Sequence, residues 1–184
     1  MRFEKFKNSL SLSVFTVVQA AQTNVQLARW HKAGKLIRLK RGVYQFADRQ
    51  VEEFSMANFL YSPSYISLET ALNNFGTIPD VSANVISISP VTTKIIKTVK
   101  GIFLYSKIDQ ALYFGWQKIK DGSGIYYQIA LPEKALLDWI YLRKISNLKE
   151  QRVDLSGLNR TRLKQFSRFF PGWVKGVINE QFNR

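Results

Sequence analysis

Residues 23–46, TNVQLARWHKAGKLIRLKRGVYQF, decide the fold of the first part of the chain. The segment from Val25 to Ala33 reads as a short helix, and Thr23 or Asn24 before it can cap its first turn. Gly34 can end this helix, because a glycine readily takes the left-handed conformation that terminates helices. One short helix is therefore expected at the start of the quoted stretch.

A basic hairpin is expected after this helix. Residues 36–40 (LIRLK) and 43–46 (VYQF) both read as strands, and Arg41-Gly42 lies between them, where the hairpin must turn. Upstream, residues 3–10 and 14–21 are two short apolar segments that we predict as helices. Three short helices followed by a basic hairpin is the order of a winged helix-turn-helix.

The remainder of the chain predicts a mixed α/β domain with a small sheet and a helical C-terminus. Helical patterns occur near residues 51–60, 67–75, 133–143 and 159–170, and strand-like segments occupy 84–89, 101–107 and 125–130. The expected fold class is therefore α+β. We expect two domains: a winged helix-turn-helix over residues 1–48 and an α/β domain over residues 49–184.

The charge of the chain is strongly basic and unevenly distributed. The formal net charge is +14, which indicates a polyanionic partner, above all nucleic acid. Residues 1–50 hold 10 basic against 2 acidic residues, a balance of +8, whereas residues 51–141 hold 7 against 8, a balance of −1. Residues 142–184 hold 10 against 3, a balance of +7. Two basic surfaces, or one built from both ends, are expected.

Several classes of chemistry are absent from the sequence. There is no cysteine and only one histidine, which excludes disulfides, thiolate zinc sites and cysteine nucleophiles. Asp121-Gly122-Ser123-Gly124 contains a Gly-Ser pair but no carboxylate pair follows it, so we interpret it as a tight turn. We expect no enzyme, no metal and no cofactor. No apolar run reaches the length of a membrane span or signal peptide, so a cytoplasmic protein is expected.

A winged helix-turn-helix would place its third helix in the major groove of DNA, where Asn and Gln pair with adenine and Arg with guanine. The start of that helix and the lysines after it suit phosphates, and arginines near the hairpin turn suit a narrow minor groove. The alternative is that the hairpin is only a solvated basic face. The residues expected to contact double-stranded DNA are Thr23, Asn24, Gln26, Arg29, Lys32, Lys35, Arg38, Lys40 and Arg41.

Other side chains of this region are assigned to the core rather than to DNA. We expect Val25, Leu27 and Ala28 to face inward from the third helix. His31 is expected at the surface or against the backbone, because a lone histidine has no partner for a metal site. The aromatic residues expected in the core rather than as stacking platforms are Phe15, Trp30 and Tyr44.

The C-terminal region offers a second candidate basic patch. Arg160, Lys164 and Arg168 are spaced four residues apart and would share one helix face, opposite an apolar side. This helix is either an ordinary surface helix or a patch that faces phosphates or a protein partner. In the preceding helix, Glu133, Lys134 and Asp138 are interpreted as surface charges, with Lys134 and Asp138 as an i, i+4 pair.

Three segments of the chain resemble the AbiEi family of antitoxins and transcriptional regulators. Residues 27–44 resemble the helix-Gly-strand-Arg-Gly-Val-Tyr core of that family. Residues 65–72, followed by Gly-Thr-Ile-Pro at 76–79, are similar to the start of its second domain. Residues 131–138, LPEKALLD, resemble the segment in which the family reads Pro-Glu-Lys-Ala-Leu. The three matches occur in family order.

The resemblance implies an antitoxin of a type IV toxin–antitoxin system, a class involved in abortive infection by phage. Such a protein binds double-stranded DNA at its own promoter as a repressor. It counteracts a nucleotidyltransferase-like toxin without a stable complex. Two alternatives stay open: a solitary winged-helix regulator without a toxin, and a binding module for RNA or an acidic protein. No membrane partner is expected.

Overall fold

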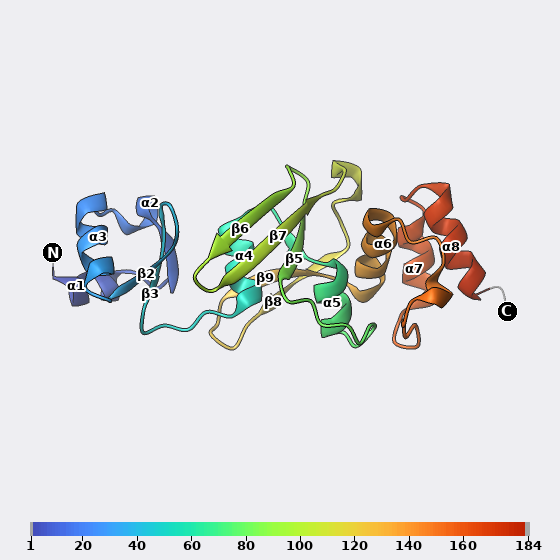
Figure 1. The fold of residues 1–184 in the computed structure, drawn as a ribbon, viewed down its shortest axis with the longest axis horizontal. Coiled ribbons are helices and arrows are strands. Elements are labelled where there is room, and N and C mark those ends of the chain that lie inside the picture. Colours follow the sequence, from blue (N-terminus) through green and yellow to red (C-terminus); the bar gives the residue numbers. More distant parts are fainter. Residues whose placement is uncertain (1, 183–184) are drawn as a thin grey trace.

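The computed structural model describes residues 2–182 and has a mixed α+β fold (Figure 1). Residues 2–48, which we call the N-terminal unit, contain three helices and a three-stranded antiparallel sheet of order β1-β3-β2. Its elements are α1 (Phe3–Ser9), β1 (Val14–Thr16), α2 (Val17–Ala20), α3 (Asn24–Lys32), β2 (Leu36–Lys40) and β3 (Val43–Phe46).

The predicted second helix is only partly correct, because its first three residues form the strand β1. Phe15 pairs with Tyr44 of β3, and both side chains are buried among aromatic rings. Thr16 then starts the four-residue α2 through a capping box, in which its side chain accepts from the Gln19 N–H and the Gln19 side chain bonds the Thr16 backbone. Burying Phe15 in a sheet displaced the expected helix.

Helix α3 agrees in position with the prediction but not in its inward face. Leu27 is fully buried and Trp30 is 6% exposed, whereas Val25 and Ala28 are exposed. The cause is Trp30, whose ring stacks on Phe6 of α1 with centroids 4.7 Å apart. The expectation that Val25 and Ala28 face inward was therefore wrong. Phe15, Trp30 and Tyr44 lie in the core, as expected.

The predicted turns of this region are present. Gly34 has φ of +72° after α3, and Gly42 has φ of +76° between β2 and β3. Both angles lie in the left-handed region that favours glycine. A β-bulge lies between Arg38 and Lys40 of β2, and in this part of the strand Leu39 is buried while Arg38 is exposed.

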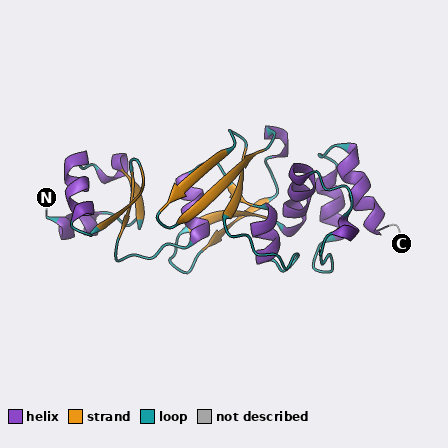
Figure 2. Cartoon of the chain, viewed as in Figure 1, coloured by secondary structure: helices purple, strands orange, loops and turns teal. Residues whose placement is uncertain are grey.

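A mixed six-stranded sheet of order β6-β7-β5-β4-β9-β8 forms the centre of the molecule (Figure 2). The strands expected near 84–89, 101–107 and 125–130 are present, and three further strands were not predicted. β5 is buried along its whole length, because α4 and α5 both pack on it. The strands are β4 (Tyr65–Ile66), β5 (Val85–Ser89), β6 (Lys94–Thr98), β7 (Gly101–Lys107), β8 (Trp116–Lys120) and β9 (Tyr126–Ala130).

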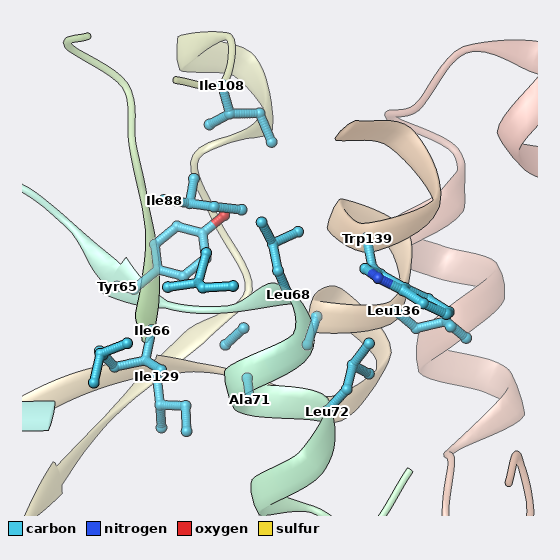
Figure 3. Packing of buried hydrophobic residues seen from close by; sticks show 14 of the residues in the cluster. Tyr65, Ile66, Leu68, Ala71, Leu72, Ile88, Ile108, Ile129, Leu136 and Trp139 are labelled. Carbon is cyan, nitrogen blue, oxygen red and sulfur yellow. The ribbon is translucent and has the colours of Figure 1, made fainter. Parts of the chain in front are cut away.

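Helices surround this sheet and end the chain. α5 and α6 pack on each other, and Leu68 and Leu72 of α5 belong to the same hydrophobic cluster as Leu136 and Trp139 of α6 (Figure 3). The tail after Pro171, for which no helix was predicted, forms α8 and packs on α6. The elements are α4 (Glu53–Leu60), α5 (Leu68–Asn74), α6 (Pro132–Arg143), α7 (Arg160–Ser167) and α8 (Gly172–Phe182), with 3-10 turns η1 (Gln110–Leu112) and η2 (Leu148–Glu150).

The N-terminal unit has its own aromatic core but is not independent of the central sheet. Its small core contains Phe6, Phe15, Leu27, Trp30 and Phe46, among others. Three of its apolar side chains instead join the large hydrophobic cluster of the central sheet, and these are Val14, Leu39 and Val43. The N-terminal unit lies at one end of the molecule in Figure 1, and α7 and α8 lie at the other.

Candidate nucleic-acid interface

A cleft of about 440 Å³ lies between α3 and the β2–β3 hairpin. One wall is the N-terminal half of α3, and the other is the hairpin turn with its two arginines. Both walls come from the stretch that the sequence indicated. The residues that line the cleft are Val17, Asn24, Ala28, Arg38, Arg41, Gly42 and Tyr44.

Local backbone geometry places the two arginines at the cleft. Arg41 precedes Gly42, whose left-handed conformation makes the hairpin turn. Arg38 stands just before the bulge in β2 and is exposed. The Val17 N–H donates to the Gly42 carbonyl at 3.0 Å, which fixes the turn against the start of α2. Two guanidinium groups are thus held beside the exposed side of α3.

The predicted contacts on α3 fall on accessible surface. Thr23, Asn24, Arg29 and Lys32 are exposed, and Gln26 is partly exposed. Thr23 also has a structural role, because its Oγ1 accepts from the Gln26 N–H at 3.2 Å and caps the helix. Asn24 is the member of this group that lines the cleft with the arginines.

The two lysines predicted beyond α3, Lys35 and Lys40, have different surroundings. Lys35 is exposed, and its Nζ lies 4.9 Å from the centroid of the Phe3 ring on α1. Lys40 lies on the side of the hairpin that faces the central sheet. Its Nζ donates to the Leu60 carbonyl at the end of α4, at 2.6 Å. Burial and the nearby charge of Lys94 lower the pKa of Lys40. The structure therefore does not bring Lys40 to the cleft.

His31 connects α3 with the first hairpin strand. Its Nδ1 lies 2.9 Å from the Leu36 carbonyl oxygen, and the residue is exposed. This placement agrees with the expected position at the surface and against the backbone. Within residues 2–182, no group of three or more His, Cys, Asp or Glu side chains could hold a metal ion.

The positive charge around the cleft is not neutralised within the part of the chain that the structure describes. No ion pair involves Arg29, Lys32, Arg38 or Arg41 among residues 2–182. The acidic side chain that follows β3, Asp48, is paired with Lys7, and the hydrogen bond from Lys7 lowers the pKa of Asp48. The cleft therefore presents cationic groups to an external anion.

Exposed apolar side chains also occur on α2 and α3, and two of them, Val25 and Ala28, were expected to face inward. Val18 of α2 is 88% exposed and Val25 of α3 is 62% exposed. Ala28 is exposed one turn after Val25 and lines the cleft. For Val25 and Ala28, the sequence signal was the helical register of α3, which the buried Trp30 sets.

The second basic patch lies on α7, at the far end of the molecule from the cleft (Figure 1). Arg160, Lys164 and Arg168 are exposed, while Leu163 and Phe170 are buried in the large cluster. The shared basic face and the apolar side are thus both present. The structure does not bring this patch together with α3 and the hairpin.

The charges of α6 are not surface charges, which corrects a prediction. Lys134 and Asp138 are 0% exposed and form an ion pair within the core. Lys134 Nζ also donates to the Tyr65 hydroxyl at 2.8 Å. The hydroxyls of Tyr65 and Ser67 each donate to Asp138 Oδ2 at 2.9 Å. Tyr65 of β4, Phe114 after η1 and Phe170 after α7 lie around the pair, so it is enclosed.

Aromatic rings complete the surroundings of the buried lysine. The Nζ atom of Lys134 lies 5.3 Å from the ring centroids of Tyr65, Phe114 and Phe170. Burial lowers the pKa of Lys134 and raises the pKa of Asp138. Glu133 is buried as well, and it accepts from the Asn159 N–H at 2.8 Å before α7. These groups tie helices together and do not line a cleft.

The Gly-Ser segment at residues 121–124 is a turn, as predicted. Asp121 Oδ1 accepts from the Ile125 N–H at 2.8 Å, and Ser55 donates to Asp121 Oδ2 at 2.5 Å.

Within the described range no helix is long and apolar enough to cross a membrane. Comparison with protein-family models and with curated proteins finds no match to this chain.

Proposed function

We propose that the N-terminal unit is a winged helix-turn-helix that binds double-stranded DNA. In this proposal α3 enters the major groove and the β2–β3 hairpin is the wing. The observation that carries it is the cleft in which Asn24, Arg38 and Arg41 meet without any acidic partner among residues 2–182. Unpaired arginines beside an exposed helix match the phosphate and base contacts that such proteins make.

The residues of this surface would have different tasks. Asn24 and Arg29 are placed for base edges, since Asn pairs with adenine and Arg with guanine. Lys32, Arg38 and Arg41 are placed for phosphates, which carry most of the affinity. Gln26, Thr23 and Lys35 lie at the margins of this surface. Lys40 is left out, because its ammonium group is bound to the Leu60 carbonyl.

The cellular role we propose is that of a cytoplasmic, non-enzymatic repressor of its own promoter, and of an antitoxin in a type IV toxin–antitoxin pair. The support for the antitoxin role is the resemblance to the AbiEi family over residues 27–44, 65–79 and 131–138. These segments coincide with α3 to β3, with β4 and α5, and with the start of α6. The test is to inspect the neighbouring genes and to co-express the products. We expect a nucleotidyltransferase-like gene beside this one, and we expect the protein to suppress the toxicity of its product. A solitary regulator would lack that neighbour.

DNA binding is tested by titrating the full-length protein with a duplex from its own upstream region over a series of salt concentrations. Arg38→Ala and Arg41→Ala should each weaken binding and lower the salt slope by roughly one, because each removes one phosphate contact. Arg29→Ala should cost ~1–3 kcal/mol on the preferred sequence and relax its preference. Lys107→Ala, an exposed lysine on β7, is the charge-matched control. Unchanged binding in all three arginine variants would contradict the docking.

A further inference from the structure

Two exposed hydrophobic residues on α3 have no role in the core of the protein. Val25 is 62% exposed, and Ala28 is exposed one turn later on the same side of the helix. The inward side of α3 is already filled by Leu27 and Trp30. Helix formation does not call for a valine here either, since a β-branched side chain is slightly unfavourable in a helix. Val25 is therefore available to contact a partner on the exposed side of the helix.

The surroundings of Val25 define the kind of partner that could cover it. Asn24 precedes it, and Arg29 and Lys32 follow it on the exposed side of the helix. Arg38 and Arg41 stand across the cleft that Ala28 lines. Charge complementarity therefore favours a partner that is anionic over most of its surface. An apolar protein surface or a neutral ligand would not match the charge of these cations, whereas an anionic partner does.

Duplex DNA combines these two properties. Its backbone is anionic, and the thymine C5 methyl is the apolar group that A·T pairs present in the major groove. Small aliphatic side chains on a helix in that groove contact this methyl group. We propose that Val25, with Ala28 beside it, recognises thymine methyl groups in the DNA site. The inference rests on the proposed DNA-binding function and adds the base that the start of α3 reads.

The test uses the full-length protein and a duplex enriched by it from a randomised pool. The same duplex is then prepared with deoxyuridine in place of each thymine in turn, which removes only the C5 methyl group. At one or two positions the unaltered protein should bind the uracil form about fourfold more weakly, which corresponds to the ~0.8 kcal/mol of one buried methyl-sized group. At the position that Val25 contacts, Val25→Ala should bind the thymine and uracil forms equally.

Control variants separate this inference from general effects. Val99→Ala removes a valine that is 77% exposed between β6 and β7, and it should keep the full thymine preference. Val25→Thr keeps one methyl group at the same place and should retain part of the preference. Because Val25 is exposed, Val25→Ala should unfold at the same temperature as the unaltered protein.

The outcomes distinguish the two proposals. Salt-dependent binding with no uracil effect at any position would overturn the thymine assignment and leave the DNA-binding function standing. Equal binding of both DNA forms by the unaltered protein, together with loss of self-association in Val25→Ala, would also overturn it and assign Val25 to a contact between copies of this chain. No enrichment of any duplex would remove the proposed function, and the thymine assignment with it.

Discussion

A lysine with no exposed surface, such as Lys134, keeps its charge only if partners replace the water it has lost. Asp138 supplies the counter-charge, the Tyr65 hydroxyl accepts a hydrogen bond, and three aromatic rings surround the ammonium group. Tyr65 and Ser67 in turn donate to the carboxylate. Each polar atom of the pair therefore has a partner, and the pair fixes α6 against β4.

Removing one member of this pair should be far more harmful than removing both. Lys134→Met leaves Asp138 buried without a counter-charge, and we expect a loss of ~3–5 kcal/mol in the free energy of unfolding. The double variant Lys134→Met with Asp138→Leu should recover most of that loss. Chemical denaturation of the three proteins measures this. A double variant as unstable as the single one would contradict the view that the uncompensated charge is the cause.

The sequence could not place this pair in the core. Lys134 and Asp138 have the spacing of an ordinary surface ion pair on a helix, and lysine is among the residues least often buried. What buries them is the packing of Tyr65, Phe114 and Phe170 around α6, which is a tertiary effect. The register of α3 illustrates the same limit, because Trp30 rather than Val25 and Ala28 took the inward position against Phe6.

At the scale of elements, Glu69 joins α5 to α6 through three hydrogen bonds. Its carboxylate accepts from Trp139 Nε1 at 3.0 Å and from Arg143 Nε and Nη2 at 2.7 and 2.9 Å. Burial alone would raise the pKa of Glu69, but the hydrogen bonds and charge of Arg143, with the bond from Trp139, leave it below its usual value of 4.5. The bidentate geometry makes this a bridge between the two helices.

This bridge should give the fold a defined acid sensitivity. A carboxyl whose pKa is lower in the folded state stabilises the protein above its unfolded pKa, and that contribution disappears as the pH falls through the folded value. We expect Glu69→Gln to cost about 1 kcal/mol at neutral pH, given the partial exposure of Arg143. Its stability should also fall less steeply below pH 4.5. Parallel slopes for both proteins in that acid range, measured by thermal unfolding, would exclude Glu69 as the cause.

Elements with strong local signals were predictable from the sequence. α3, the β2–β3 hairpin, α5 and the proline-initiated α6 follow from caps, glycines and periodicity. The cleft that the first two enclose was not predicted, although Asn24, Arg38 and Arg41, which line it, were expected to contact DNA. β1, β4, β6, β8 and α8 were missed. β1 is three residues long and exists through pairing with β3, while β6 and β8 are edge strands whose side chains are largely exposed. Their existence depends on neighbours distant in the sequence.

For the whole molecule, Lys40 is one of the contacts between the N-terminal unit and the rest of the chain. Its predicted contact with phosphate is replaced by a hydrogen bond to the end of α4. Lys40→Ala should therefore leave the salt slope of DNA binding unchanged and lower the free energy of unfolding by about 1 kcal/mol. Arg41→Ala, one residue along, is the matched variant. It should lower the salt slope of DNA binding and leave the free energy of unfolding unchanged. A salt slope reduced equally in both variants would show that Lys40 contacts DNA, as the sequence predicted.

The three apolar side chains that the N-terminal unit contributes to the large cluster have a consequence for protein engineering. Val14, Leu39 and Val43 do not line the cleft. They would nevertheless lose their neighbours in the large cluster if residues 2–48 were fused to an unrelated domain. A chimera made by exchanging this unit would expose them and leave a void in the remaining chain. Retargeting should instead graft only the outward positions of α3, namely residues 25, 28, 29 and 32.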